Sequence, residues 1–482
     1  MYLGIDLGTS GVKVLLIDQA QAIVDSASAP LSVSNPRHGW SEQDPLSWVT
    51  ATESALSALA ERNELATVKG IGLSGQMHGA TLLDAAGEII RPCVLWNDVR
   101  SHAEAAELNS NPLFEQVTGN VVFPGFTAPK IAWCAVHEKE NVDRIAKVLL
   151  PKDYLRYWLT GEYVSDMSDA SGTGWLDIGA RQWSVDLLAA TGLSIDHMPS
   201  LVEGTAVSGQ LRSELAGQFG MSSSVVVAGG AGDNAASACG LGAVKPGTAF
   251  ASLGTSGVLF VSNERFKPNA ASAVHAFCHA IPERWHQMGV ILSATDSLNW
   301  YARIAGTDAT DLTAALGRTL KAPSHVTFLP YLSGERTPHN DAHIRGVLSG
   351  ITTSTGRDDL TQAVLDGVSF AFRDNLSALV AAGTEVERVT AVGGGSQSRY
   401  WLASLATCLN IPIDVLDGGE FGAAFGAARL GLIAAENSNA EAVCQSAPAA
   451  FTIEPDAGQV AAYDDAYQHF RALYPALKSA AV

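Results

Sequence analysis

The clearest feature of the apolar and polar pattern is a repeat. Leu-Gly-Thr-Ser-Gly-Val occupies positions 7–12 and recurs unchanged at 253–258, about half of the 482-residue chain further on. Each copy lies between two apolar, β-rich runs, which predicts two β-hairpins, over 2–17 and 248–261, each with a short glycine-containing turn. Identical turns at half-chain spacing indicate an internal duplication, so we predict two related domains.

Other apolar runs predict strands that end in glycine-rich or polar segments. The runs 68–73 and 225–228 lead into the polar segment 74–79 and the glycines 229–232, and the run 389–392 leads into the glycines 393–395. Helices are predicted after Asp44-Pro45 and Pro151, and over 235–240, 294–300, 359–383 and 399–409. A strand followed by glycines and a helix is typical of an anion site.

We place the domain boundary at Lys245-Pro246-Gly247, just before the second predicted hairpin. The two predicted domains are therefore residues 1–244 and 245–482.

The two repeated turns differ in charge. Asp6 precedes the first copy and Lys13 follows it, whereas Ser252 and Leu259 stand at the same places in the second copy. Glycine N–H groups and the Thr and Ser hydroxyls can cradle phosphate. We therefore expect a metal and the transferred phosphoryl group at the first turn and a neutral phosphate cradle at the second. The alternative is that both are ordinary hairpin turns.

Asp233 stands where a predicted strand turns into a predicted helix. An N-cap is the commonest use of aspartate at such a place, but the small residues around Asp233 would let a ligand approach its carboxylate. A free aspartate titrates near ~3.9, so the sequence predicts an ionised carboxylate. Such a weak base can accept a proton only as a new bond forms.

The net charge limits the kinds of molecule that the protein is expected to bind. The net charge is −19, with 47% hydrophobic and 16% charged residues, which disfavours nucleic acid and means that a bound nucleotide needs Mg²⁺ and backbone donors. The six scattered cysteines are typical of reduced thiols in an intracellular protein. No signal-peptide pattern or membrane span is predicted, so we expect a cytoplasmic location. A homodimer is left open.

Several common active-site motifs are absent from the sequence. It contains no G-x-x-x-x-G-K-[ST] loop, no well-placed G-x-G-x-x-G and no G-x-S-x-G elbow, which disfavours P-loop enzymes, dinucleotide dehydrogenases and α/β-type serine hydrolases. His275, Cys278, His279 and His286 lie close together in sequence, but their spacing fits no standard zinc site. That segment is predicted to form strand, turn and strand.

Four segments together resemble the FGGY family of carbohydrate kinases. They are residues 4–9, the Gly-Asp-Asn at 232–234, the run 346–366 and the glycines 393–395, and the resemblance covers nearly the whole chain. Residues 125–137 follow the family pattern more loosely, with departures at Cys134 and Val136. The resemblance implies an α/β fold of two actin-like (ribonuclease H-like) domains with a deep cleft between them. It assigns the sugar and the catalytic base to the N-terminal domain, residues 1–244, and the nucleotide to the C-terminal domain, residues 245–482.

The resemblance also implies an activity, transfer of the γ-phosphoryl group of ATP to a terminal sugar hydroxyl. It makes Asp233 the base, assigns Asp6 to Mg²⁺ with Gly8 beside it in the catalytic turn, and assigns Met77 and His78 to the sugar. From their polar groups and apolar surface we add Gln76, Trp96 and Asn234 to the sugar site. The nucleotide contacts expected are Gly8, Thr9, Ser10, Lys13, Gly254, Thr255, Thr295, Asn299, Gly394 and Gly395.

Segments 74–79 and 331–339 are most similar to family members that act on D-xylulose. We therefore expect D-xylulose as the sugar, with ribulose, gluconate or glycerol as alternatives inside the family. A further alternative is an actin-like ATPase that is not a kinase and needs no sugar base. The resemblance gives no role to Glu335 and Arg336.

Overall fold

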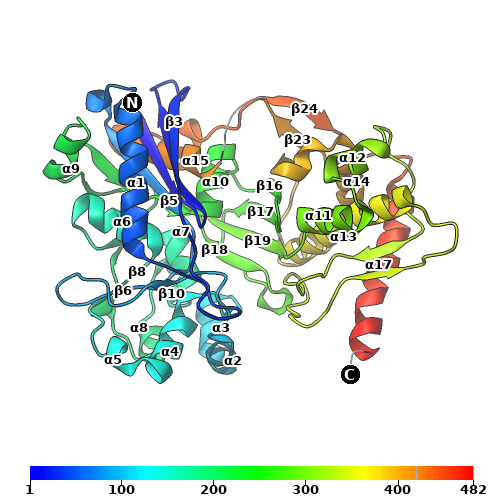
Figure 1. Cartoon of the computed structure of the whole chain (residues 1–482), viewed down its shortest axis with the longest axis horizontal. Coiled ribbons are helices and arrows are strands. Elements are labelled where there is room, and N and C mark those ends of the chain that lie inside the picture. The colour runs from blue at the N-terminus through cyan, green and yellow to red at the C-terminus, as the bar shows by residue number, and fades with distance from the viewer. Residues whose placement is uncertain (418–421, 481–482) are drawn as a thin grey trace.

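Two mixed β-sheets dominate the fold. A computed structural model of the protein describes residues 1–417 and 422–480. The strands of the first sheet are β1 (Tyr2–Leu7), β2 (Gly11–Ile17), β3 (Ile23–Pro30), β5 (Gly70–Gly75), β13 (Val207–Gln210), β14 (Val226–Ala228) and β15 (Ala231–Gly232). Those of the second are β16 (Thr248–Leu253), β17 (Gly257–Asn263), β18 (His275–Cys278), β19 (Trp285–Ile291), β22 (Arg388–Val392), β23 (Ile413–Leu416) and β24 (Ala449–Ile453). Figure 1 shows the first sheet on the left and the second on the right.

The two sheets share one pairing scheme. The order β14-β5-β1-β2-β3 in the first matches β23-β22-β16-β17-β19 in the second. In both, the hairpin strands pair antiparallel, and the first hairpin strand pairs in parallel with the strand that carries the next glycine or polar segment. The predicted hairpins and the internal duplication are thereby confirmed.

Helices cover both sheets and fill the space between them (Figure 1). The α-helices of the first half are α1 (Pro45–Ala60), α2 (His102–Ser110), α3 (Pro112–Thr118), α4 (Thr127–His137), α5 (Lys139–Val142), α6 (Pro151–Thr160), α7 (Met167–Ala170), α8 (Val185–Ala190), α9 (Ser213–Gln218) and α10 (Asp233–Leu241). Those of the second half are α11 (Thr295–Ala305), α12 (Ala309–Ala315), α13 (Arg357–Ala381), α14 (Arg399–Leu409), α15 (Ala423–Glu436), α16 (Ala440–Val443) and α17 (Val460–Ala480). No helix in these described parts is long and apolar enough to cross a membrane.

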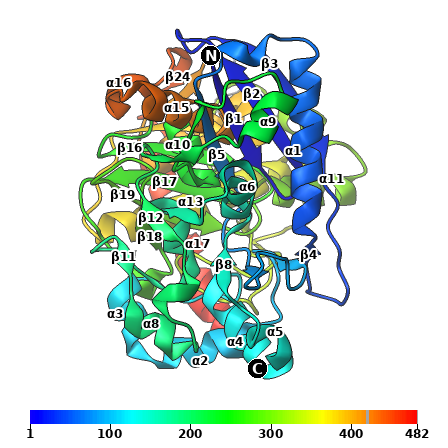
Figure 2. The ribbon, with the colours of Figure 1, turned by 90° about the vertical axis from the view of Figure 1, so that its left-hand side faces the viewer.

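A lobe built mainly from the segment between β5 and β13 extends from the first sheet, and Figure 2 shows it below that sheet. It contains helices α2 to α8 and short paired strands: β6 (Thr81–Leu83) with β8 (Lys147–Leu149), β9 (Val164–Asp166) with β12 (Ser200–Val202), β10 (Leu176–Asp177) with β11 (Gln182–Trp183), and β7 (Cys93–Val94) with β4 (Glu42–Gln43). In the second half, β20 (Thr327–Leu329) pairs with β21 (Val347–Ser349). The apolar core of the lobe includes Phe260 and Phe277 of the second sheet, so the two halves share it.

Most predicted element limits agree with the structure to within two residues. The long helix predicted over 359–383 begins two residues earlier, at Arg357, because the Asp359 carboxylate accepts a hydrogen bond from the Gly356 N–H (2.9 Å). It ends at Ala381 with Ala382 as its C-cap, and Gly383 follows in the left-handed region at φ +81°. The predicted end at Gly383 is thus two residues late, and Gly383 occupies the position after the C-cap, where a left-handed glycine commonly ends a helix.

Helix α15 comes from the second half of the chain but packs on the first sheet. Figure 1 shows it, in orange, beside α10 and the blue strands. A Cβ on Gly4 would lie 1.9 Å from the Ala424 oxygen, and one on Gly72 would lie 1.8 Å from the Ala427 oxygen. The two halves therefore interlock at this helix, and the boundary before Lys245 remains a prediction.

The close approach of α15 to β5 predicts a large cost for a single added methyl group. Gly72→Ala should lower the free energy of unfolding by about 3 kcal/mol, the upper end of the usual cost of overpacking a core. A Cβ on Gly217, which is exposed in α9, meets no atom within 4 Å, so Gly217→Ala is the matched control and should stabilise the protein by roughly 0.5–1 kcal/mol. Chemical denaturation measures both variants, and equal stability of the two would contradict this packing.

Candidate active site

Two carboxylates lie at the ends of neighbouring strands in the first sheet. Asp6 is opposite Lys13 on β2 and Ser74 on β5, and Ser74 is in turn opposite Ala231 on β15. Asp233 follows β15 directly as the first residue of α10. The parallel register therefore brings Asp6 and Asp233 to the same edge of the sheet.

Asp233 is a stronger base than an ordinary aspartate. Burial raises its pKa to about 6, and the negative charge of Asp6 adds to the rise. The Asn234 backbone N–H (2.7 Å) and side-chain Nδ2 (3.0 Å) donate to Asp233 Oδ1 and partly oppose it. The sequence analysis assumed the ordinary aspartate pKa near ~3.9, and this value was too low because the sequence reveals neither burial nor the neighbouring carboxylate. The expected ionised state at neutral pH agrees with a pKa of about 6.

Asp233 is also not the helix cap that the alternative interpretation required. The N-cap of α10 is Gly232, and no side chain caps this helix. The Asp233 carboxylate bonds only to its neighbour Asn234 among the described hydrogen-bond partners. Its side chain is therefore available for another partner.

Asp6 is the second unusual carboxylate. Burial raises its pKa, while the neighbouring Ser74 hydroxyl and the Lys13 ammonium oppose the rise. Its Oδ1 atom is buried and has no hydrogen-bond partner in the described parts of the chain. A buried carboxylate oxygen without a donor is suited to bind a cation, which is the role that the sequence predicts for Asp6.

The first repeated turn is held by side chains from three other segments. Thr9 Oγ1 donates to Gln76 Oε1 (3.1 Å) and accepts from Trp96 Nε1 (3.0 Å). Gln43 Nε2 donates to the Thr9 carbonyl (2.7 Å), and Gln76 Nε2 donates to Gln43 Oε1 (2.9 Å). Gln76 and Trp96, which we predicted as sugar contacts, thus support the turn, whose own Gly8 N–H donates to Gly11 (3.0 Å). Ser10 at its tip is exposed.

The second turn is held by the start of α11. The Gly254 carbonyl accepts from the backbone N–H (2.9 Å) and the hydroxyl (2.7 Å) of Thr295, and the Thr255 carbonyl accepts from the Ala294 N–H (2.8 Å). Thr295 is therefore a support of the predicted nucleotide turn. Asn299, one helical turn further along α11, is exposed.

The glycine loop after β22 packs directly on the second turn. Gly393 has φ +88°, and a Cβ there would lie 2.7 Å from the Leu253 oxygen, so only glycine fits. A Cβ on Gly394 would meet nothing within 4 Å, which leaves this residue open to a ligand. Gly395 is buried and packs against Leu253.

A cavity of about 400 Å³ joins the two halves at this point. Asn234 and Ser237 of α10 line it from the first half, and Ser252, Gly393 and Ser396 line it from the second. Its lining includes Asn234, the residue next to Asp233, and Gly393 of the glycine loop, so predicted segments from both halves of the chain face one space.

Met77 and His78 lie in the segment that follows β5, the strand that pairs with β15 just before Asp233. Met77 is 7% exposed, and a Cβ on Gly232 would lie 2.8 Å from its sulfur atom. The His78 ring stacks on Phe126 with centroids 4.8 Å apart, and its Nδ1 lies 2.7 Å from the Gly172 carbonyl. Since a carbonyl only accepts, Nδ1 carries the hydrogen and Nε2 is an acceptor.

His78 stays neutral in this position. Burial lowers its pKa to about 3, the Gly172 carbonyl opposes the fall, and the charges of Lys130 and Arg336 add to it. Arg336 comes from the segment 331–339, and its guanidinium lies over the Phe123 ring at 4.5 Å. This segment is anchored by Glu335, whose Oε1 accepts from the Leu292 N–H (3.1 Å) and the Arg336 N–H (2.7 Å).

In the part of the chain that the structure describes, the histidines and the cysteine noted in the sequence do not gather as a metal site. His275 and His286 lie in adjacent strands among phenylalanine rings. In the described parts of the chain, carboxylates gather with metal-like geometry only at Asp153, Asp166 and Asp169. Lys152 Nζ already lies among these three, at 2.5, 2.7 and 3.2 Å, so this cluster is an ion-pair network.

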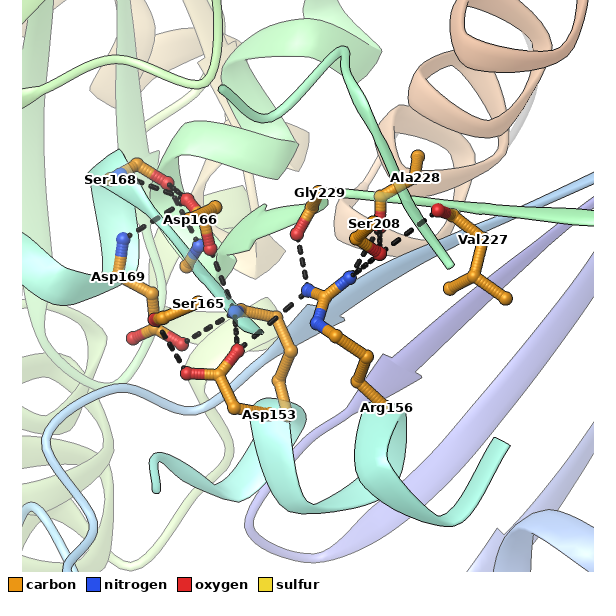
Figure 3. Close-up of polar contacts among 12 residues, drawn as sticks. Asp153, Arg156, Ser165, Asp166, Ser168, Asp169, Ser208, Val227, Ala228 and Gly229 are labelled. Atoms are coloured by element: carbon orange, nitrogen blue, oxygen red, sulfur yellow. Dashed lines mark hydrogen bonds and ion pairs between the residues drawn. The ribbon is translucent and has the colours of Figure 1, made fainter. Parts of the chain in front are cut away.

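The same network supports the chain that leads to Asp233 (Figure 3). The Arg156 guanidinium donates to the carbonyls of Ala228 (2.5 Å) and Gly229, and to Ser208 Oγ. The backbone N–H and the hydroxyl of Ser168 both donate to Asp166 Oδ1. The Ser168 hydroxyl oxygen in turn accepts a hydrogen bond from the Gly232 N–H (3.1 Å). Sequence analysis missed this support, as it missed Gln43, because no local pattern marks either.

Comparison with known proteins agrees with this arrangement. Family models for the N-terminal and C-terminal domains of the FGGY family of carbohydrate kinases match residues 1–240 and 249–435. The chain is 48% identical to a xylulose kinase of Escherichia coli over 481 residues, covering 99% of both chains. A solved structure of a "xyloylose kinase" from Brucella ovis is 61% identical, with a TM-score of 0.98 and 99% coverage of both chains. A xylulose kinase structure from Rhodospirillum rubrum is 29% identical, with a TM-score of 0.93 and the same coverage.

These similarities establish the fold class. The structure is the two-domain, actin-like (ribonuclease H-like) α/β fold that the sequence predicts.

The proximity of the two carboxylates predicts a measurable coupling. Asp6→Asn removes the negative charge that helps to raise the pKa of Asp233, so this pKa should fall below about 6. It should stay above the ordinary ~3.9, because burial is the larger cause. Carbon-13 NMR of labelled aspartate in the metal-free protein measures it. Asp18→Asn removes an equal charge at the far end of β2 as a control, and the same Asp233 pKa in both variants would contradict the coupling.

Proposed function

This chain belongs to the FGGY family of carbohydrate kinases, and we propose that it phosphorylates D-xylulose at its terminal C5 hydroxyl with ATP as the donor. The observation that carries the proposal is the site around Asp233. Met77 packs against Gly232, the residue before this base, and the neutral His78 follows Met77, while Asn234, the residue after the base, lines the cavity shared by both halves of the chain. The curated relatives described above, named xylulose kinases, support the choice of sugar.

The chemistry assigned to Asp233 is general base catalysis. The sugar hydroxyl oxygen forms a bond to the γ-phosphorus of ATP while the bond from that phosphorus to the bridging oxygen of ADP breaks. The hydroxyl proton passes to the Asp233 carboxylate. A pKa of about 6 keeps Asp233 largely deprotonated at neutral pH and places it close to the pH at which it works. Such a transition state is loose, so orienting the hydroxyl matters as much as basicity.

The sugar contacts follow from the hydrogen-bonding state of each side chain. His78 presents an Nε2 acceptor to a sugar hydroxyl, because its Nδ1–H is bonded to Gly172. Asn234 adds a polar amide beside the base, and Met77 supplies an apolar surface for the carbon face of the sugar. A site that hydrogen-bonds hydroxyls discriminates strongly, because a substrate that lacks one leaves a buried group unpaired.

We assign ATP to the turns and the glycine loop. Gly254, Thr255, Gly394 and Gly395 would hold the phosphates from the second half, and Thr9, Ser10 and Lys13 would meet the transferred phosphoryl group from the first. Thr295 acts by fixing the second turn, through its two bonds to Gly254. Family membership implies ATP as a substrate.

Mg²⁺ is the metal that we propose for this reaction. The residues present fit it, since Asp6 Oδ1 is a hard oxygen ligand, is buried and has no hydrogen-bond donor in the described parts of the chain. When bound there, Mg²⁺ would neutralise phosphate charge, which this acidic protein with a net charge of −19 cannot do well by itself. A cytoplasmic location, where ATP is abundant, is part of the proposal, and a homodimer remains a prediction.

Loss of the base should reduce turnover far more than ATP binding. Asp233→Asn keeps the shape of the side chain and removes the proton acceptor, so kcat should fall by about 10²–10⁴. Isothermal titration should show ATP binding close to that of the unchanged protein. Asp186→Asn makes the same change in the first turn of α8, where the side chain is exposed, and should keep full activity. A near-normal kcat for Asp233→Asn would remove Asp233 from the chemistry.

A panel of sugars tests the substrate. We expect kcat/KM for D-xylulose to be at least tenfold higher than for ribulose, glycerol or gluconate, since one unpaired buried group costs ~1–3 kcal/mol. His78→Ala should lower kcat/KM for the sugar much more than it raises KM for ATP. If glycerol or gluconate were the best substrate, the family membership would stand and the choice of sugar would be wrong.

A further inference from the structure

Lys130 is a buried lysine for which the mechanism above has no use. It lies on α4, in the first turn after Thr127, and is 1% exposed. Its Nζ atom donates to the backbone carbonyl of His78 at 2.8 Å. Within residues 1–417 and 422–480 it forms no ion pair, and the nearby Asp98 accepts two hydrogen bonds from the Arg100 side chain (2.9 and 2.6 Å).

A lysine ammonium group that is buried with only a carbonyl partner lowers the stability of the folded protein. Taking such a charge out of water costs much more than one hydrogen bond returns, so buried charges are normally paired. Burial lowers the pKa of Lys130 to about 7. In the neutral form its amine still donates to the His78 carbonyl, so the contact persists over the working pH range.

The recipient of this bond has an unusual backbone. His78 has φ +71°, in the left-handed region that residues with a Cβ rarely adopt. The same His78 carbonyl accepts a second bond from Thr127 Oγ1 (3.1 Å), and Thr127 is fully buried. Two donors from the first turn of α4 thus converge on one carbonyl and hold the backbone of His78 in place.

The ring of His78 is fixed just as tightly on its other side. A Cβ on Gly172 would lie 2.4 Å from the His78 ring, so the imidazole can approach only because residue 172 is glycine. The Nδ1–H of the ring then donates a hydrogen bond to the Gly172 carbonyl. Phe126, the residue before Thr127, stacks on the ring face. The start of α4 therefore contacts the backbone of His78 and the face of its ring, and Nε2 is the polar atom left for a ligand.

We propose that Lys130 and Thr127 are positioning residues for sugar recognition: by hydrogen bonding the His78 carbonyl they hold its left-handed backbone, and so direct Nε2 at a sugar hydroxyl. This inference rests on the proposed function, in which His78 contacts the sugar. It assigns no chemical step to Lys130. Their effect on the reaction passes through His78 and leaves the nucleotide site unchanged.

The test is a double-mutant cycle on the folded, full-length enzyme. Lys130→Met should lower kcat/KM for the sugar at least tenfold, mainly through a higher KM for the sugar, with KM for ATP unchanged. Thr127→Val, which keeps the shape of the side chain, should give a smaller loss of the same kind. In a His78→Ala background neither change should lower kcat/KM further. Non-additivity of this kind is the signature of residues that act through one partner.

A matched control is available in the same lobe. Lys147 Nζ also donates to backbone carbonyls, of Asp196 (2.7 Å) and Met198 (3.2 Å), away from the site. Lys147→Met should therefore leave kcat/KM for the sugar unchanged. If Lys130→Met does not fold, Thr127→Val and its pair with His78→Ala carry the test alone.

Three results would overturn the inference. The first is a loss of kcat/KM from Lys130→Met that is equally large in the unchanged enzyme and in the His78→Ala background. The second is a rise of KM for ATP in Lys130→Met as large as the rise of KM for the sugar. The third is a His78→Ala variant whose kinetics are unchanged for every sugar. The measurements use whichever sugar is the best substrate in the panel above. A wrong choice of D-xylulose would therefore overturn the proposed function and leave the positioning role tested.

Discussion

The site depends on a buried set of charges that is not itself in the site. Lys152 and Arg156 of α6 lie among Asp153, Asp166 and Asp169, and all five side chains are fully buried. Two positive and three negative groups would leave one buried charge unbalanced. Burial raises the pKa of Asp169 well above its usual range, and the neighbouring carboxylates add to the rise while the Lys152 ammonium opposes it.

The position of this network explains why such a costly arrangement is present. The chain from β14 to α10 is almost all glycine and alanine, so its own side chains cannot fix it. Arg156 holds the Ala228 and Gly229 carbonyls, and Ser168 holds the Gly232 N–H. Asp233 is the next residue. A glycine-rich turn that admits a ligand needs outside support, and removing one partner would leave an uncompensated buried charge.

The sequence could predict what is encoded locally or repeated. The hairpins, the glycine loop after β22 and the strand-to-helix position of Asp233 all follow from short patterns, and the duplication made them clear. The roles of Gln76 and Trp96 could not be predicted, because they depend on contacts with Thr9 across 67 and 87 positions. The pKa of Asp233 depends on burial and on Asp6, which are tertiary facts. Lys130 falls in a segment whose family pattern looked weak at Cys134 and Val136, yet its contact with His78 is specific.

Helix α15 shows why the two halves of the chain cannot be treated as independent. On one side it packs against the backbone of β1 and β5 at Gly4 and Gly72, and on the other its Gly426 meets the Ala236 oxygen of α10. Strand β1 carries Asp6, and α10 begins with Asp233. One helix of the second half therefore packs against both elements that carry the carboxylates of the first. Because no methyl group fits at these contacts, the packing distance is set by backbone atoms, and the two elements that carry Asp6 and Asp233 are held together by a segment almost two hundred residues beyond Asp233.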